Sequence, residues 1–212
     1  MVEIILFIFF FIVLIFSVIL HEISHGYVAL HLGDPTAKYA GRLSLNPLKH
    51  LDPIGSVFLP LFLIALALIT KGGIIFGWAK PVPINPLNFR DKKYGSAKVA
   101  VAGPLSNLLI AVIFGLFLRF IPFQNEAIFY FFSIIIYINL LLFLFNLLPI
   151  PPLDGSHILF TFLPAEARAL KIFLYQWGFF ILLIFIFFGF KYLLPLILWI
   201  YKIIVGINFP LI

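Results

Sequence analysis

The sequence predicts an all-α polytopic membrane protein with about five or six transmembrane helices. Of its 212 residues, 64% are hydrophobic and only 10% are charged, a balance that water-soluble domains of this size do not have. The mean hydropathy is +1.19. Several apolar runs approach the roughly 20 residues that a helix needs to cross a bilayer core about 30 Å thick.

The apolar runs give the expected helices in chain order. No linker is long enough to hold a separate soluble domain, so we expect one membrane-embedded domain over residues 1–212, with a core at about 15–160 and C-terminal helices at about 170–212. The expected spans are 4–30, 99–118, 127–148, 172–190 and a last run, 192–210, which Pro195 and Lys202 interrupt.

Two stretches between the first and second long runs are less regular. Residues 54–70 form a shorter apolar run with Pro60 near its middle. They fit either a re-entrant hairpin or a single spanning helix, and the short length, the proline and the basic flanks favour the hairpin. Residues 71–96 are rich in Gly, Pro and Asn, which predicts turns with short extended strands at the membrane interface.

The charged residues indicate topology rather than nucleic-acid binding. The net charge is +6, and nine of the fourteen basic residues lie between Lys38 and Lys98 without clustered aromatic platforms. Basic residues concentrate on the cytoplasmic side of membrane proteins, so we expect a lipid bilayer as partner and no nucleic acid. The chain has no cysteine, so any metal ligands must come from His, Asp, Glu or Asn.

The motif "HEISH" places three ionisable side chains in an apolar helix. His21 and His25 are four residues apart, so they lie about 40° apart on one helical face and can bind one ion. Glu22 is placed to hold the proton of an attacking water, as in the HExxH pattern of zinc hydrolases. Two packing histidines with an interfacial glutamate would give the same pattern. Ionisable groups inside a bilayer are costly, however, which favours a functional site.

A catalytic zinc site needs a third protein ligand and an open position. In "NLLPIPPLDGSHILF", prolines end an apolar helix and Gly155 permits a tight turn beside Asp154. Irregular backbone at membrane depth must be buried in protein or line a wet cavity. One Zn²⁺ would also balance the charges of Asp154 and Glu22. His157 is the rival third ligand, and we favour Asp154.

Two asparagines interrupt later apolar helices. Asn107 lies in "VAVAGPLSNLLIAV", where Pro104 fits a first helical turn and Gly103 permits close approach of another backbone. Asn146 ends the next apolar run. Each could form a helix–helix hydrogen bond or polarise a substrate carbonyl, and the sequence leaves both roles open.

The motifs "HEISHG", "AGPLSN" and "NLLPIPPLDG", in this order, resemble the site-2 protease family of intramembrane zinc metalloproteases over about residues 15–160. The resemblance implies that His21, His25 and Asp154 bind one Zn²⁺ and that Glu22 is the general base. It also implies that Asn107 and Asn146 line the site and hold substrate or stabilise the oxyanion. Many relatives carry a PDZ or CBS domain, and we expect a compact member with neither.

The sequence therefore predicts a zinc endopeptidase that cleaves transmembrane segments of membrane-protein substrates. The expected location is a prokaryotic cell (inner) membrane, with the active site toward the cytoplasmic side. The alternative is a non-catalytic membrane protein that binds metal or substrate. For the protease, the three motifs must meet at one depth, which requires Asn107 to begin its helix on the same side as His25.

Overall fold

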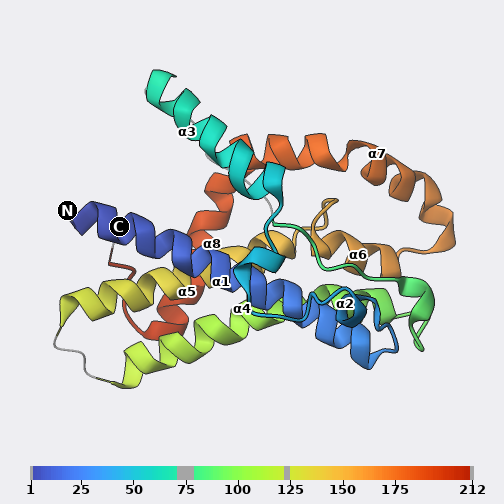
Figure 1. The fold of residues 1–212 in the computed structure, drawn as a ribbon, viewed down its shortest axis with the longest axis horizontal. Helices are drawn as coiled ribbons and strands as arrows, with labels where there is room; N and C mark the ends of the chain where they lie inside the picture. The colour runs from blue at the N-terminus through green and yellow to red at the C-terminus, as the bar shows by residue number, and fades with distance from the viewer. Residues whose placement is uncertain (1, 71–78, 122–124, 211–212) are drawn as a thin grey trace.

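The computed structural model describes residues 2–70, 79–121 and 125–210 (Figure 1). This part of the chain is largely helical and contains no β-strand. The elements in order are α1 (Val2–His31), α2 (Thr36–Tyr39), η1 (Pro47–Lys49), η2 (Pro53–Phe58), α3 (Leu59–Thr70), η3 (Pro86–Asn88), α4 (Gly95–Phe120), α5 (Glu126–Asn146), α6 (Asp154–Phe162), η4 (Ala165–Ala167), α7 (Arg168–Ile184), η5 (Phe185–Gly189) and α8 (Phe190–Val205).

Three long helices form the centre of the molecule. Helix α4 packs against both α1 and α5, and α5 also packs against α1 and α8. The main apolar cluster lies between α4, α5 and α8, where Ile136, Leu140, Ile197 and Tyr201 are completely buried. The centre of the fold therefore joins the three segments that carry the sequence motifs, from α1, α4 and the end of α5.

Four helical stretches in the described chain are long and apolar enough to cross a membrane: residues 4–31, 95–120, 126–146 and 168–205. Their outward faces carry large exposed apolar side chains, such as Phe7, Leu109 and Phe187. Such faces suit hydrocarbon rather than water. The fold class is thus an all-α polytopic membrane protein, as the sequence predicts.

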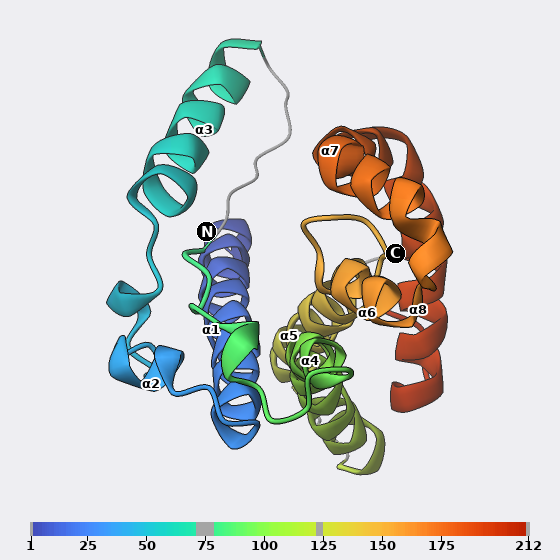
Figure 2. The same ribbon diagram turned by 90° about the vertical axis from the view of Figure 1, so that its right-hand side faces the viewer.

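The C-terminal spans differ from expectation in where the chain bends. Helices α7 and α8 are joined by the π-helical segment η5, and the direction of the chain changes there (Figures 1 and 2). Pro195 was expected to interrupt the last run, but it lies inside α8. A proline within a membrane helix is tolerated where neighbouring groups and local π adjustments satisfy the freed backbone, and η5 ends six residues before Pro195.

Residues 53–70 run in one direction as η2 followed by α3, so this part contains no hairpin turn. Helix α3 projects away from the bundle (Figure 1) and lies on the α1 side of the molecule, apart from α7 (Figure 2). Residues 71–78 lie outside the described residues. Asn107 nevertheless reaches His21, so the motifs meet as the protease interpretation requires.

Residues 79–85, called here the 79–85 segment, contain neither helix nor strand. The N–H of Lys80 donates to the backbone carbonyl of His50 at 2.9 Å, and several other backbone groups of the segment bond to side chains. The Arg42 guanidinium donates to the carbonyls of Lys80 and Pro81, at 3.0 and 3.1 Å. The backbone N–H of Val82 donates to the Glu22 carboxylate at 2.8 Å. These partners satisfy several backbone groups of the segment, and the expected interfacial strand does not form in it.

The buried carboxylate of Asp34 fixes the far end of this segment. It accepts hydrogen bonds from the backbone N–H of Asn85 at 2.7 Å, from the Asn88 amide at 2.8 Å, and from the backbone and hydroxyl of Thr36. Burial raises the pKa of Asp34, but these hydrogen bonds outweigh it and hold the pKa below its ordinary value. Asp34 therefore stabilises the folded protein in its charged form.

Replacing Asp34 with asparagine is expected to destabilise the protein by about 1–3 kcal/mol at pH 7, because buried hydrogen bonds lose their acceptor. The pKa of Asp34 is lower in the folded protein than in the unfolded chain. The stabilisation by Asp34 is therefore complete at pH values above its pKa in the unfolded chain. It is lost as the pH falls through its pKa in the folded protein. The loss on acidification should thus be smaller in Asp34→Asn than in wild type. Thermal unfolding in detergent between pH 7 and pH 3 measures both effects. Asp91→Asn, which removes an exposed pair with Lys98, is the control and should change stability less.

Candidate metal centre

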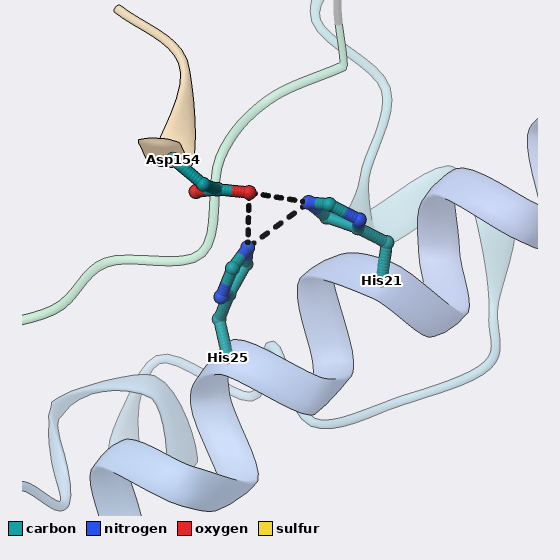
Figure 3. Close-up of side chains that lie close together, drawn as sticks. All are labelled: His21, His25 and Asp154. Atoms are coloured by element: carbon teal, nitrogen blue, oxygen red, sulfur yellow. Dashed lines mark hydrogen bonds and ion pairs between the residues drawn. The ribbon is translucent and has the colours of Figure 1, made fainter. Parts of the chain in front are cut away.

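Two histidines of α1 and one aspartate of α6 converge on one point (Figure 3). The Nε2 atoms of His21 and His25 are 3.0 Å apart, and both residues are 6% exposed. Asp154 Oδ2 lies 3.0 Å from His21 Nε2 and 3.3 Å from His25 Nε2. The fold thus joins residues 133 positions apart in the chain.

Hydrogen bonds behind the rings determine which nitrogen faces this point. His25 Nδ1 lies 2.7 Å from the backbone carbonyl of Val99, which can only accept, so Nδ1 carries the hydrogen. His21 Nδ1 lies 2.6 Å from Asn107 Oδ1. With Nδ1 as the donor in both rings, each Nε2 presents its lone pair. Two lone pairs and a carboxylate oxygen then face one another and need a cation or a proton between them.

The three donor atoms fit a small tetrahedral metal ion. Ligand atoms about 2.0–2.1 Å from a tetrahedral zinc lie roughly 3.3 Å from one another, and the three separations are 3.0, 3.0 and 3.3 Å. Two neutral imidazoles with one carboxylate are a donor set typical of zinc sites that keep a position open. Both imidazoles also have the acceptor behind Nδ1 that orients a metal-binding histidine.

One face of α4 supports both histidines. Val99, Gly103 and Asn107 are four residues apart in turn, so they lie along one side of the helix. Val99 and Asn107 hold the two rings, and Gly103 lies between them. A Cβ atom at Gly103 would come within 2.4 Å of His25 Nε2 and 2.5 Å of His21 Nε2. Only glycine leaves this space beside the donor nitrogens open.

The turn between α5 and α6 positions Asp154. Helix α5 ends at Asn146, and α6 begins at Asp154 itself. The next residue, Gly155, lies against the turn so closely that a Cβ atom would come within 2.2 Å of the Leu147 carbonyl oxygen and 2.4 Å of that of Leu148. A glycine at 155 therefore lets the first turn of α6 approach the histidines.

Glu22 lies beside the histidines and faces a cavity of about 400 Å³. The three converging residues line the cavity together with apolar residues, which include Val82, Ile84, Phe89, Val99 and Ala100. Glu22 is half-buried, and its Oε2 accepts the N–H of Val82. The arrangement places a carboxylate next to the candidate metal ligands, on the wall of the cavity.

The other residues predicted from the sequence divide between the cavity and the interior. Asn146 lines the cavity and donates to the carbonyl of Leu142. His157 is exposed and also lines the cavity, but it lies outside the cluster of three. Asn107 is completely buried and bonds to His21. A contact between Asn107 and the substrate stays a prediction.

Two polar residues of the site region were not predicted. Ser17 and Asn139 are buried behind Asn107 and bond to it or to each other. Each interrupts an apolar stretch of its helix, and that interruption is the signal that the sequence offers.

Comparison with known proteins relates this site to a family. Residues 121–185 match the model of Peptidase family M50. The chain is 42% identical over 182 residues to the Bacillus subtilis protein named "Putative zinc metalloprotease YwhC". The matched region covers 82% of this chain and 77% of that protein. This chain belongs to the M50 peptidase family. As an M50 protein with four apolar helical spans, it is an integral membrane protein of a metalloprotease family.

Other M50 relatives agree with this assignment. The chain is 36% identical over 172 residues to "Putative zinc metalloprotease Rip2" of Mycolicibacterium smegmatis, covering 79% of this chain and 62% of the relative. It is 42% identical over 65 residues to "Putative zinc metalloprotease MJ0611" of Methanocaldococcus jannaschii, covering 30% of this chain and 33% of the relative. No solved structure matches the chain significantly.

Proposed function

We propose that this M50 protein is an intramembrane zinc metalloendopeptidase that cleaves transmembrane segments of other membrane proteins. The observation that carries the proposal is the convergence of His21 Nε2, His25 Nε2 and Asp154 Oδ2 beside Glu22. The two histidines and Glu22 lie in an apolar membrane helix, where unpaired charge is costly and is retained for function. The family assignment and the names of its relatives supply independent support.

In this proposal, His21, His25 and Asp154 hold one Zn²⁺. The ion, when bound, polarises the scissile carbonyl and lowers the pKa of a water molecule toward 7. Val99 and Asn107 keep the imidazoles oriented through Nδ1. The carboxylate of Asp154 offsets part of the positive charge, which reduces the cost of placing the ion at membrane depth.

Glu22 acts as the general base and then as the general acid. Its Oε2 accepts the N–H of Val82, which fixes the carboxylate at the cavity edge. Its other oxygen, Oε1, takes the proton from the attacking water and returns it to the leaving amine. Asn146, at the cavity wall, is placed to bind the substrate backbone with its amide.

The substrate is a transmembrane helix that unwinds locally, because a helical peptide bond is hydrogen-bonded and shielded. The apolar wall of the cavity suits the side chains of such a segment. The concentration of basic residues between Lys38 and Lys98 supports an orientation with the active site toward the cytoplasm of a prokaryotic cell membrane. Water then reaches the zinc site from that side.

The test is the zinc content of the purified protein, with cleavage of a transmembrane model substrate. Wild type should contain about one zinc per chain, and removal by a chelator should abolish cleavage until zinc is restored. Asp154→Ala should lose both zinc and cleavage, whereas His157→Ala should keep its zinc. The reverse pattern would make His157 the third ligand. A wild-type protein that binds zinc without cleaving would be a metal-binding membrane protein instead.

A further inference from the structure

A chain of buried polar side chains lies behind His21, on the side away from the cavity. It consists of Ser17 on α1, Asn107 on α4 and Asn139 on α5. The two asparagines are completely buried, and Ser17 is 4% exposed. Three uncharged polar residues at one point inside a membrane bundle are costly unless fully hydrogen-bonded. Their bonds fix the direction of each amide.

Two backbone carbonyls set these directions, because a carbonyl oxygen can only accept. The Ile135 carbonyl lies 2.9 Å from the Asn139 nitrogen Nδ2, so the Asn139 oxygen Oδ1 must point the other way. There it accepts from Asn107 Nδ2 at 2.9 Å. Asn107 Nδ2 also lies 3.3 Å from the Ser17 carbonyl. The oxygen of Asn107 is then the atom that faces His21.

Ser17 completes the arrangement through its hydroxyl, which accepts from Asn139 Nδ2 at 2.9 Å. Both N–H groups of Asn139 are therefore used, one by Ser17 and one by Ile135. Neither asparagine can turn its amide over without placing an oxygen against a backbone carbonyl. The hydrogen bond from His21 Nδ1 to Asn107 Oδ1 is 2.6 Å long. Its direction is thus fixed by Asn139 and Ser17, which bond to the Asn107 amide.

We propose that Asn139 and Ser17 are positioning residues for the metal centre. Through Asn107 they hold the His21 ring with its hydrogen on Nδ1 and its Nε2 lone pair toward Asp154 and His25. The inference rests on the proposed role of His21 as a zinc ligand. It assigns Asn107 to the support of His21 rather than to contact with the substrate.

The other histidine shows why this support is needed at only one ring. His25 Nδ1 bonds to the backbone carbonyl of Val99, which cannot turn over and fixes the ring without further help. An amide side chain lacks this fixed direction, so Asn107 needs partners that orient it. Partners of this kind, behind a ligand, typically change metal affinity by about 10–100-fold when they are lost.

The test is zinc affinity in detergent, measured by competition with a chelator. Asn107→Leu and Asn139→Leu should weaken zinc binding by about 10–100-fold. Asn107→Asp keeps an acceptor for His21 Nδ1 but places its second oxygen against the Ser17 carbonyl and the Asn139 oxygen, so it should regain only part of the affinity that Asn107→Leu loses. Ser133→Ala is the matched control. It removes another buried hydrogen bond of α5, to Tyr201, and should leave zinc affinity unchanged.

If the variants at positions 107 and 139 bind zinc as tightly as Ser133→Ala does, the inference is wrong. Asn107→Leu with full zinc affinity but no cleavage would instead place Asn107 in contact with the substrate. If Asn139→Leu does not fold, Ser17→Ala is tested in its place and should also weaken zinc binding. If Ser17→Ala binds zinc as tightly as Ser133→Ala does, the inference is wrong. Failure of wild type itself to bind zinc would be a failure of the proposed function.

Discussion

Replacing Glu22 with glutamine is expected to lower the cleavage rate by about 10²–10⁴-fold while the zinc content stays at the wild-type level. A general base or acid contributes a factor of this size, and an amide cannot take up the proton. The glutamine keeps an oxygen that can accept the N–H of Val82, so the contact that fixes the side chain survives. Structure and metal binding should therefore be retained.

The measurement is cleavage of a transmembrane model substrate by wild type and Glu22→Gln, with zinc determined on the same samples. Glu126→Gln is the matched control, because Glu126 is exposed in the first turn of α5, away from the cavity. It should cleave at the wild-type rate. Wild-type cleavage by Glu22→Gln would exclude Glu22 as the base. Loss of zinc in that variant would show that Glu22 contributes to the metal site itself.

The sequence predicts the fold class and the meeting of its three motifs for simple physical reasons. The thickness of the bilayer sets the length of a helix that crosses it. The apolar runs therefore predict the positions of the long helices to within a few residues. His21 and His25 share a helical face because of their spacing. Asp154 stood out because few acids lie beside a long apolar helix, and the structure places it 3.0 Å from His21.

Other features could not be predicted because they depend on packing. Glu22 accepts a hydrogen bond from the backbone N–H of Val82. Every residue except proline has this N–H, so the side chains of the 79–85 segment do not predict the bond. Ser17 lies one helical turn before His21, but its spacing alone names no partner, and only the packing of α1, α4 and α5 brings it to Asn139. Asn107 had two possible roles in the sequence, and its hydrogen bonds to His21 and Asn139 favour the interior one.

The direction of residues 53–70 was open for a similar reason. The sequence interpretation takes Pro60 as a sign of a hairpin, but the π-helical η2 continues directly into α3, so Pro60 lies inside one continuous helical run. Prolines are tolerated in membrane helices, where local π adjustments satisfy the freed backbone groups. The proline therefore carries no information about a reversal.

Gly103→Ala is expected to abolish both zinc binding and cleavage, although it adds a single methyl group. The new Cβ would lie within 2.4–2.5 Å of the Nε2 atoms of both histidines, far inside van der Waals contact. Side-chain ends can often move aside, but these rings are held from behind by Val99 and Asn107, which belong to the same face of α4. Moving α4 away would carry those acceptors with it, so one added methyl cannot be accommodated without loss of the ligand geometry.

The same helix offers a control that separates this effect from general packing. A Cβ atom at Gly115 would come within 2.3 Å of the Ile204 side chain on α8, so Gly115→Ala should also lower thermal stability, as overpacking typically does. It lies three turns beyond Gly103 and should keep its zinc. Zinc content and thermal unfolding of the two variants therefore distinguish a damaged bundle from a blocked metal site. If Gly103→Ala retains zinc and cleaves while Gly115→Ala behaves as expected, the two imidazoles are free to rearrange, and α4 does not hold them in the way that their hydrogen bonds indicate.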